Sequence, residues 1–422
     1  MTDRVYDYAG PPRVCHEGHV YYETDVMRER YDLPDVDQRE QTVADVEDRL
    51  DVVVSGGSMG GLFAATALRQ AGHDVTVFEV TERGKMQERG AGIIAHPEML
   101  TYLEEQGIAD WDELATHTNR THHLDGAGKP VDVEGHATYT TSWDTVYRKL
   151  RDDLPDGTYR MGKETTGVEQ HDDGVTVSFA DGDQVEADLL VVGEGYRSST
   201  REQFAPDRTP EYSGYVAYRG TLPESAVLPE YPSLFSDVYN LYHAPRSQFL
   251  TYPVPGPNGE MERGERRINW VWYYPFEEGE ALDDLLYDNR GVQRSHSLPP
   301  WLMREAVRDQ QIEIAGEILP PQMEWLVRQT DEPFVQCIYD LAIPKMVYDD
   351  VCILGDAAFF IRPHMAAGTA HAAADALELA ESIYTTDDLD TALAEWERDQ
   401  VEMGYRLVEE ASRRGDRYTG QF

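Results

Sequence analysis

Lysine and cysteine are scarce in this 422-residue chain, and long apolar runs are missing. Lys+Arg total 37 against 79 Asp+Glu, which leaves a formal net charge of −42 at pH 7. A field of this sign repels nucleic acid and anionic membrane surfaces, so neither is expected as a partner. No stretch approaches the ~20 apolar residues of a membrane-spanning helix, and the chain starts without an apolar signal segment. We therefore expect a soluble, cytoplasmic protein.

The three cysteines are Cys15, Cys337 and Cys352. Their odd number and wide spacing support neither a disulfide framework nor a zinc site, and they suit a reducing compartment. The stretch "CHEGH" at 15–19 adds only two histidines to one cysteine, which is too few ligands for a structural zinc centre. No metal is expected.

Acidic clusters such as "DLPDVD" and "TDDLD" are spread along the whole chain rather than gathered in one tail. Our hypothesis is an adaptation to high salt, where screening collapses the self-repulsion of a dense acidic surface. An ordinary acidic enzyme is the alternative.

The clearest pattern is "RLDVVVSGGSMGGLFAATALRQAGHDVTVFEV" at 49–80, which predicts an apolar strand, a glycine-rich turn, a helix and a second strand. Such a turn lets the backbone of Gly56, Ser58, Met59 and Gly60 approach a pyrophosphate at a helix N-terminus. Glu79 ends the second strand 23 positions after Gly56, near the ~20 expected of the acid that holds an adenosine ribose. This unit permits NAD or FAD.

The stretch "GDAAFFIRPHMAAGTAHAA" at 355–373 distinguishes between NAD and FAD as the bound cofactor. Asp356 follows a buried strand and can accept hydrogen bonds from a polyol such as a ribityl chain. Pro363 sets the turn, and the small residues Ala366, Ala367, Gly368 and Thr369 let a helix N-terminus approach a flat, electron-rich ring. The stretch favours a flavin, with a tightly packed, ligand-free helix as the alternative.

Strand-like segments rich in aromatic residues, such as "GYVAYRGTL" and "RRINWVWYYPF", lie between about 206 and 345. We therefore expect an α/β protein with a discontinuous, Rossmann-like FAD-binding domain of the GR2 type. Its predicted segments are an N-terminal extension at 1–48, the FAD-binding domain at 49–205 and 346–385, a β-rich substrate domain at 206–345, and a C-terminal helical segment at 386–422.

"GGSMGG" with Glu79, "RGAGI" at 89–93, "DLLVVGEGYRSSTR" at 188–201 and "VCILGDAA" at 351–358 occur in the order found in a known family. Through them the chain resembles the single-component FAD-dependent aromatic hydroxylases, typified by para-hydroxybenzoate hydroxylase. "SGYVAYRG" and "TSWDTVYRKL" look most like 2,6-dihydroxypyridine hydroxylase and its relatives, which act on hydroxylated N-heteroaromatic rings. The departures are Ser58 and Ala366 for glycine, Glu194 for Asp, Phe359 for His, and Trp143 for Arg.

The resemblance implies a monooxygenase that uses NADH or NADPH and O₂ to hydroxylate a small aromatic or N-heteroaromatic ring through a C4a-hydroperoxyflavin. It implies FAD contacts for Arg89, near the pyrophosphate, and for Glu194. A flavin-dependent reductase or oxidase and a non-catalytic flavoprotein are the alternatives. A homodimer is left open.

Three residues are predicted to act on the substrate. His364 lies in the loop expected to line the flavin, and its imidazole titrates near working pH, which suits a group that removes a phenolic proton. Tyr215 and Arg219 share one strand face by the period of two and are expected to orient the ring. The cluster Trp270, Trp272, Tyr273 and Tyr274 is interpreted as filling an interface rather than stacking on substrate.

Overall fold

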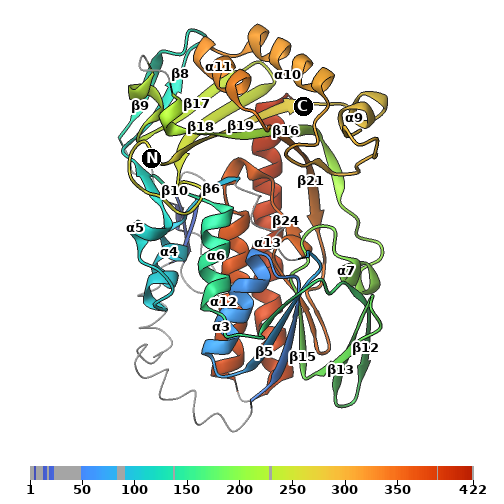
Figure 1. Cartoon of the computed structure of the whole chain (residues 1–422). Helices are drawn as coiled ribbons and strands as arrows, with labels where there is room; N and C mark the ends of the chain where they lie inside the picture. Colours follow the sequence, from blue (N-terminus) through green and yellow to red (C-terminus); the bar gives the residue numbers. More distant parts are fainter. Residues whose placement is uncertain are drawn as a thin grey trace.

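The computed structural model describes residues 49–82, 91–135, 138–227, 231–386 and 388–420, with the backbone of three short strands before them. Those strands are β1 (Arg4–Val5), β2 (Arg13–His16) and β3 (His19–Tyr22). The prediction for 1–48 otherwise falls outside the described residues. Two main sheets, one above the other, make up the body in Figure 1.

The lower body is a six-stranded sheet in the order β11-β5-β4-β15-β23-β22, parallel except for β22. Val, Leu and Ile dominate its central strands because both faces are covered. Its strands are β4 (Asp51–Ser55), β5 (Asp74–Glu79), β11 (Tyr159–Met161), β15 (Leu189–Val192), β22 (Val347–Tyr348) and β23 (Val351–Ile353).

Helices α3 (Met59–Gln70), α6 (Trp143–Asp153) and α12 (Gly368–Thr385) belong to this body. The helix α3 follows the predicted apolar spacing, and its Leu62, Ala65 and Leu68 are fully buried. A three-stranded antiparallel sheet of β12 (Thr165–His171), β13 (Gly174–Phe179) and β14 (Gln184–Ala187) packs against the sheet, and α7 (Ser199–Phe204) follows.

A second body carries a nine-stranded sheet in the order β20-β21-β16-β19-β18-β17-β8-β9, with β24 paired to β21. Its strands are β8 (Arg120–Leu124), β9 (Pro130–Glu134), β16 (Glu211–Pro223), β17 (Val238–Ala244), β18 (Ser247–Val254), β19 (Arg267–Pro275), β20 (Ser297–Leu298), β21 (Phe334–Ala342) and β24 (Phe359–Phe360).

The two faces of this large sheet have different neighbours. Trp270, Trp272 and Tyr218 lie on the outer face, in a core shared with α9 (Glu280–Leu285), α10 (Glu305–Ile318) and α11 (Pro321–Gln329). The inner face is the one that carries Tyr215, Ala217, Leu250, Tyr252, Val271 and Tyr273, and it is turned toward the lower body (Figure 1).

Smaller elements connect the two bodies. A three-stranded sheet joins β6 (Gly92–Ile94), β10 (Thr138–Ser142) and β7 (Thr116–Thr118), with α4 (Pro97–Glu105) and α5 (Trp111–Leu114) beside it. The short elements are η2 (Glu224–Ala226), α8 (Pro232–Phe235), η3 (Gly355–Ala357) and η4 (Pro363–Met365).

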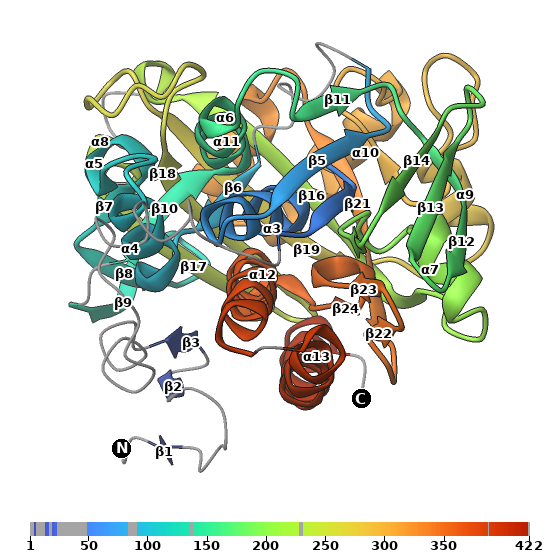
Figure 2. The same cartoon turned by 90° about the horizontal axis from the view of Figure 1, so that it is seen from below.

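The long helix α13 (Leu389–Thr419) runs beside α12 and reaches the large sheet, as Figure 2 shows from below. No helix among the described residues combines the length and apolar character needed to cross a bilayer. The predicted fold class, a Rossmann-like domain with a β-rich partner and C-terminal helices, is confirmed.

Candidate functional site

The turn between β4 and α3 is built for close approach of backbone segments. Gly56 has φ of 103°, and a Cβ on it would lie 2.5 Å from the carbonyl oxygen of Gly193. Ser58 is the N-cap of α3 and Met59 is its first residue. A Cβ on Gly60 would lie 3.0 Å from Leu354 Cδ1. The free amides of the first turn of α3 therefore stand at the carboxyl edge of the sheet, where an anion is stabilised.

Glu79 reaches this turn from the next strand. Its Oε2 accepts a hydrogen bond from Gly57 N at 2.8 Å, and its Oε1 accepts one from Thr81 N at 2.8 Å. Each carboxylate oxygen keeps a second lone pair. Glu79 thus stabilises the turn and can still accept a hydrogen bond from a ribose hydroxyl.

Glu194, a predicted cofactor contact, is engaged with the chain itself. Its Oε1 accepts bonds from Ser55 Oγ at 2.6 Å and Thr200 Oγ1 at 2.7 Å, and its Oε2 accepts bonds from Ser198 Oγ at 2.7 Å and Thr200 N at 3.2 Å. These four bonds use the lone pairs that a cofactor would need. We therefore assign Glu194 to stabilising the turn after β15.

Asp356 is the opposite case, because no side chain or amide in the described part of the chain donates a hydrogen bond to its carboxylate. Burial, with the Asp375 carboxylate nearby, raises its pKa to about 6. Asp375 Oδ2 in turn accepts a bond from Gly355 N at 2.8 Å and so holds the turn that carries Asp356. Asp356 is half-buried, so its carboxylate can reach a ligand, and a polyol hydroxyl would supply the missing donor.

The β24–α12 loop, residues 361–367, runs from the large sheet to the first turn of α12. Pro363 opens the η4 turn, and Ala366 has a left-handed backbone with φ of 52°. A Cβ on Gly368 would lie 3.8 Å from Asp356 Oδ1. Ala367 is the N-cap of α12, and Gly368 and Thr369 are its first residues. Arg89, the predicted pyrophosphate contact, lies outside the described residues.

These features fit an FAD. The glycine turn and Glu79 suit the adenosine pyrophosphate end, the unpaired Asp356 suits the ribityl chain, and the amides of α12 suit a ring that gains negative charge on reduction.

His364 is half-buried between the two bodies, and both of its ring nitrogens are engaged. Its Nε2 lies 2.9 Å from Tyr215 Oη, and its Nδ1 lies 3.1 Å from Gln248 Oε1. The amide oxygen can only accept, so Nδ1 carries the proton and Tyr215 donates to Nε2. Burial and the Arg362 charge lower the pKa of His364 to about 3. The expectation that this imidazole titrates near neutrality is therefore wrong, because burial disfavours its cation.

Arg219 lies on the inner face, as the strand period predicted. Its Nη1 donates to Gln336 Oε1 at 2.9 Å and its Nη2 to the Gly92 carbonyl at 3.2 Å. Tyr215 shares that face and is fully buried, with the Arg362 guanidinium 5.7 Å from its ring centre. The structure therefore brings Tyr215 and His364 into one hydrogen-bonded pair and places Arg219 further along the same strand.

Two sequence features have structural roles. Arg362 pairs with Asp340 and with Asp416, near the C-terminal end of α13, so its guanidinium is committed to carboxylates of the chain. The Phe359 ring packs over Gly404 of α13 and meets the ring of His371 edge-on at 6.1 Å.

The sequence-based reasoning missed inner-face residues on β18 and β19. Tyr252, Tyr273 and Gln248 lie on this face, and Tyr273 is directly opposite both Ala217 and Gln248. The signal was present, because alternation in "RINWVWYYPF" separates Tyr273 from Trp270 and Trp272. Treating these aromatic residues as one cluster obscured it.

Three side chains at the outer edge of the large sheet have metal-ligand chemistry. His123, Asp132 and Glu134 each offer one ligand atom, and these atoms lie within 4.8 Å of one another. His123 Nε2 is already 3.2 Å from Glu134 Oε1, and Asp132 is exposed. Such groupings are expected on so acidic a surface, so we assign no metal to them.

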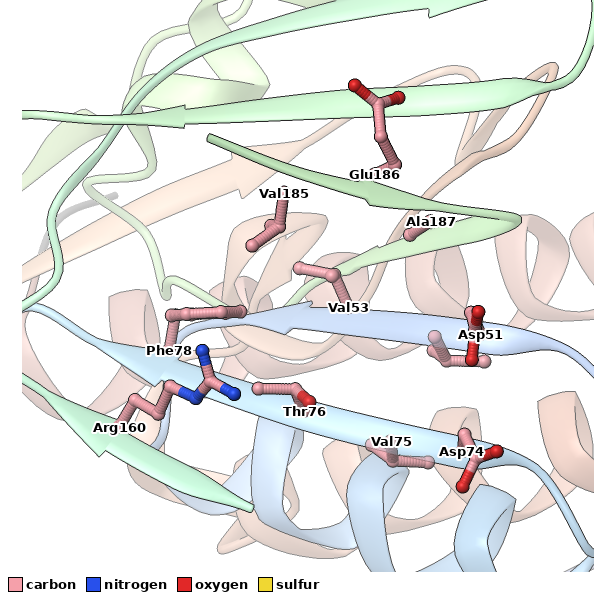
Figure 3. A pocket seen from close by; sticks show the side chains of 11 residues that line it. Asp51, Val53, Asp74, Val75, Thr76, Phe78, Arg160, Val185, Glu186 and Ala187 are labelled. Carbon is pink, nitrogen blue, oxygen red and sulfur yellow. The ribbon is translucent and has the colours of Figure 1, made fainter. Parts of the chain in front are cut away.

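A hollow of about 210 Å³ opens between the six-stranded sheet and β14 (Figure 3). Val53, Phe78 and Val185 form part of its wall, with Arg160 and Glu186 among its polar residues. None of the predicted site residues lines it, so it is separate from the candidate site.

Comparisons with known proteins agree with this geometry. Residues 212–340 match the model of the family described as FAD binding domain-like, and residues 131–268 match flavin containing amine oxidoreductase. The 2,6-dihydroxypyridine 3-monooxygenase of Paenarthrobacter nicotinovorans is 32% identical over 377 residues, which cover 88% of this chain and 91% of that protein.

A second relative is the 6-hydroxynicotinate 3-monooxygenase of Pseudomonas fluorescens, 28% identical over 79% of this chain and 82% of that protein. The solved structure of 2,6-dihydroxypyridine-3-hydroxylase from Arthrobacter nicotinovorans superposes with a TM-score of 0.81 at 31% identity, covering 87% of this chain and 93% of that one.

Proposed function

Because this chain belongs to the single-component FAD-dependent aromatic hydroxylases, we propose that it uses NAD(P)H and O₂ to hydroxylate a small hydroxylated N-heteroaromatic ring. Membership rests on a relative 32% identical across 88% of the chain. By their names, the two relatives described above act on 2,6-dihydroxypyridine and on 6-hydroxynicotinate. The observation that carries the proposal here is the unpaired Asp356 carboxylate beside the first turn of α12.

We assign the cofactor contacts to three groups of residues. The amides of Ser58, Met59 and Gly60 and the Glu79 carboxylate hold the adenosine half. Gly56, whose amide donates to the Phe78 carbonyl at 2.8 Å, lets the turn approach the cofactor closely. Asp356 accepts a hydrogen bond from the ribityl chain. Pro363, Ala366, Ala367, Gly368 and Thr369 form the wall beside the ring. Bound FAD supplies the electron transfer and the activated oxygen that no side chain of the protein can supply.

The protein's own contribution is to hold the ring and exclude water. The half-buried His364 and the buried Tyr215 form a hydrogen-bonded pair, which we assign to positioning the β24–α12 loop against the large sheet. The buried aromatic side chains of the inner face keep water away from the oxygen chemistry. His364 adds no positive charge there because its pKa of about 3 leaves it neutral at working pH.

Assembly and location are also part of the proposal. We propose a cytoplasmic enzyme, a view supported by the buried free thiols of Cys337 and Cys352, which suit a reducing compartment. We propose a homodimer, to be tested by light scattering coupled to size-exclusion chromatography.

The deciding experiment is an absorption spectrum of the purified protein, followed by NAD(P)H oxidation with and without hydroxypyridines, hydroxynicotinates and phenols. We expect a flavin spectrum, oxidation stimulated by one class of ring, and a product heavier by one oxygen from ¹⁸O₂. Stimulated oxidation without oxygen incorporation would instead identify a reductase or oxidase. A protein that stays colourless after reconstitution with FAD would refute the proposal.

A further inference from the structure

Arg219 is a cation without a carboxylate partner in the described part of the chain. Both acceptors of its hydrogen bonds, Gln336 Oε1 and the Gly92 carbonyl, are neutral, and its buried Nε has no acceptor. Arg266 and Arg362, by contrast, each pair with two carboxylates. Acidic residues outnumber basic ones by 79 to 37, so a half-buried arginine without a carboxylate partner among the described residues points to a ligand of opposite charge.

Two phenols on the same face also lack partners. Tyr252 and Tyr273 are each 3% exposed, and neither hydroxyl makes a hydrogen bond within the described residues. Burial raises the pKa of both phenols, to about 12 for Tyr273, and the positive charge of Arg219 opposes that rise in each. Arg219 is therefore close enough to act electrostatically on both hydroxyls. Each hydroxyl therefore keeps a hydrogen that it can donate to a ligand.

The strand register places an apolar surface between these polar groups. Ala217 lies opposite Tyr273, and Arg219 lies opposite Val271, which is itself opposite Leu250. Ala217, Val271 and Leu250 are buried in the inner-face core. An apolar floor edged by one cation and two hydroxyl donors is complementary to a flat ring that carries oxygen anions.

We propose that the inner face selects its substrate by charge, taking a ring with an ionised oxygen substituent and rejecting neutral rings of the same shape. Arg219 pairs with the anionic oxygen, and Tyr252 and Tyr273 donate hydrogen bonds to the ring oxygens. The ring lies against Ala217, Val271 and Leu250, and the proton of its hydroxyl stays in the solvent when the anion binds. This proposal rests on the proposed hydroxylase function and adds the ionic form of its substrate.

The test measures binding to the oxidised holoenzyme through the change in flavin absorbance. The probes are 2,6-dihydroxypyridine, which ionises, and 2,6-dimethoxypyridine, which cannot. We expect the ionising probe to bind at least about tenfold more tightly, with its Kd falling as the pH rises through its own pKa. Arg219→Gln should raise that Kd by about tenfold or more and leave the Kd of the dimethoxy probe within about twofold.

Four further variants distinguish charge from packing. Arg219→Lys should recover most of the discrimination, because it restores the cation. Tyr252→Phe and Tyr273→Phe should each weaken only the ionising probe, by a few-fold. Arg208→Gln, at an exposed position away from the inner face, removes one positive charge and should change neither Kd.

The outcomes separate this proposal from the function on which it rests. If Arg219→Gln binds both probes as the wild type does, selection by charge is refuted, while hydroxylation by the wild type still supports the hydroxylase function. Equal binding of both probes by the wild type refutes it as well. If the wild type binds FAD but no ring stimulates NAD(P)H oxidation, the proposed function fails, whatever the probes show.

Discussion

Ala366 has a left-handed backbone, with φ of 52° and ψ of 22°, although it carries a side chain. That conformation costs an L-residue roughly 1 kcal/mol relative to glycine. The family resemblance had marked this position as one where glycine is frequent, and the backbone angle supplies the physical reason. Neighbouring Ala367 is in the right-handed region, with φ of −91° and ψ of −14°.

Ala366→Gly is therefore expected to leave stability unchanged or raise it by up to about 1 kcal/mol, since relief of strain competes with the greater entropy of the unfolded chain. Ala367→Gly has no strain to relieve, and the preference for glycine at this N-cap position offsets the greater entropy of the unfolded chain, so stability should change by less than about 0.5 kcal/mol. Urea unfolding of the two variants side by side measures the difference. A larger loss for Ala366→Gly than for Ala367→Gly would contradict the strain argument.

Asp356 provides a prediction with a defined pH window. Its pKa is about 6 in the folded protein against 3.8 for the ordinary carboxyl group, so the folded state keeps a proton that the unfolded state loses between these values. Its contribution to stability is thus fully present below about pH 4 and is lost as the pH rises through 6. Asp356→Asn should remove this loss and make the flavin-free protein more stable at pH 7, by up to about 3 kcal/mol.

The same substitution should weaken FAD binding, because a neutral amide is a poorer acceptor for a ribityl hydroxyl than a carboxylate. Denaturant unfolding of the flavin-free protein between pH 4 and 8, combined with fluorescence titration of FAD, measures both effects. A variant that is no more stable and binds FAD as tightly as the wild type would count against the role of Asp356.

Among the elements, α13 packs so closely on the β24–α12 region that one of its residues must be glycine. A Cβ on Gly404 would lie 2.3 Å from Cδ2 of the Phe359 ring, which is itself fully buried. Helix α10 offers a matched position, because Gly316 is exposed and a Cβ there would meet nothing within 4 Å.

Gly404→Ala should therefore destabilise the protein by about 1–3 kcal/mol through overpacking. Gly316→Ala should stabilise it by up to about 1 kcal/mol, because alanine is the better helix former. Thermal unfolding of the two holoenzyme variants provides the comparison. Equal effects at the two positions would show that intrinsic helix propensity, not contact with Phe359, governs Gly404.

The salt hypothesis belongs to the whole molecule and stays a prediction. With a net charge of −42, self-repulsion acts across the entire surface. Raising KCl from about 0.1 M to about 1 M shortens the Debye length from ~10 Å to ~3 Å. We expect Tm to rise over that range, as measured by scanning calorimetry with FAD in excess. A Tm that is highest at low salt would favour the ordinary acidic enzyme.

Much of the fold and of the cofactor region could be predicted from short, local patterns. One example is the βαβ unit at the start of the FAD-binding domain. It consists of consecutive elements, so the spacing of Gly56, the following helix and Glu79 was enough to predict it. Glu194 could not be assigned in this way, because its partners Ser55 and Thr200 come together only through the parallel pairing of β4 and β15.

The inner face of the large sheet could be predicted from the sequence only in part. Strand alternation placed Tyr215 and Arg219 on one face, but it could not show that Tyr252 and Tyr273 join Arg219 there. That depends on the register of three antiparallel strands. The lowered pKa of His364 could not be predicted from the sequence either, because desolvation depends on the residues that surround the imidazole.

The sequence by itself determined the fold class, the FAD-binding turn and the membership of the hydroxylase family, because glycines, buried strands and an acid at fixed spacing encode local geometry directly. Only the tertiary structure decided that burial lowers the pKa of His364, that Arg362 pairs with Asp340 and Asp416, and that Arg219 has no carboxylate partner among the described residues. The pKa of a side chain, its burial and its ion-pair partners depend on residues that are distant in sequence. They are therefore defined only once the chain has folded and brought those residues together.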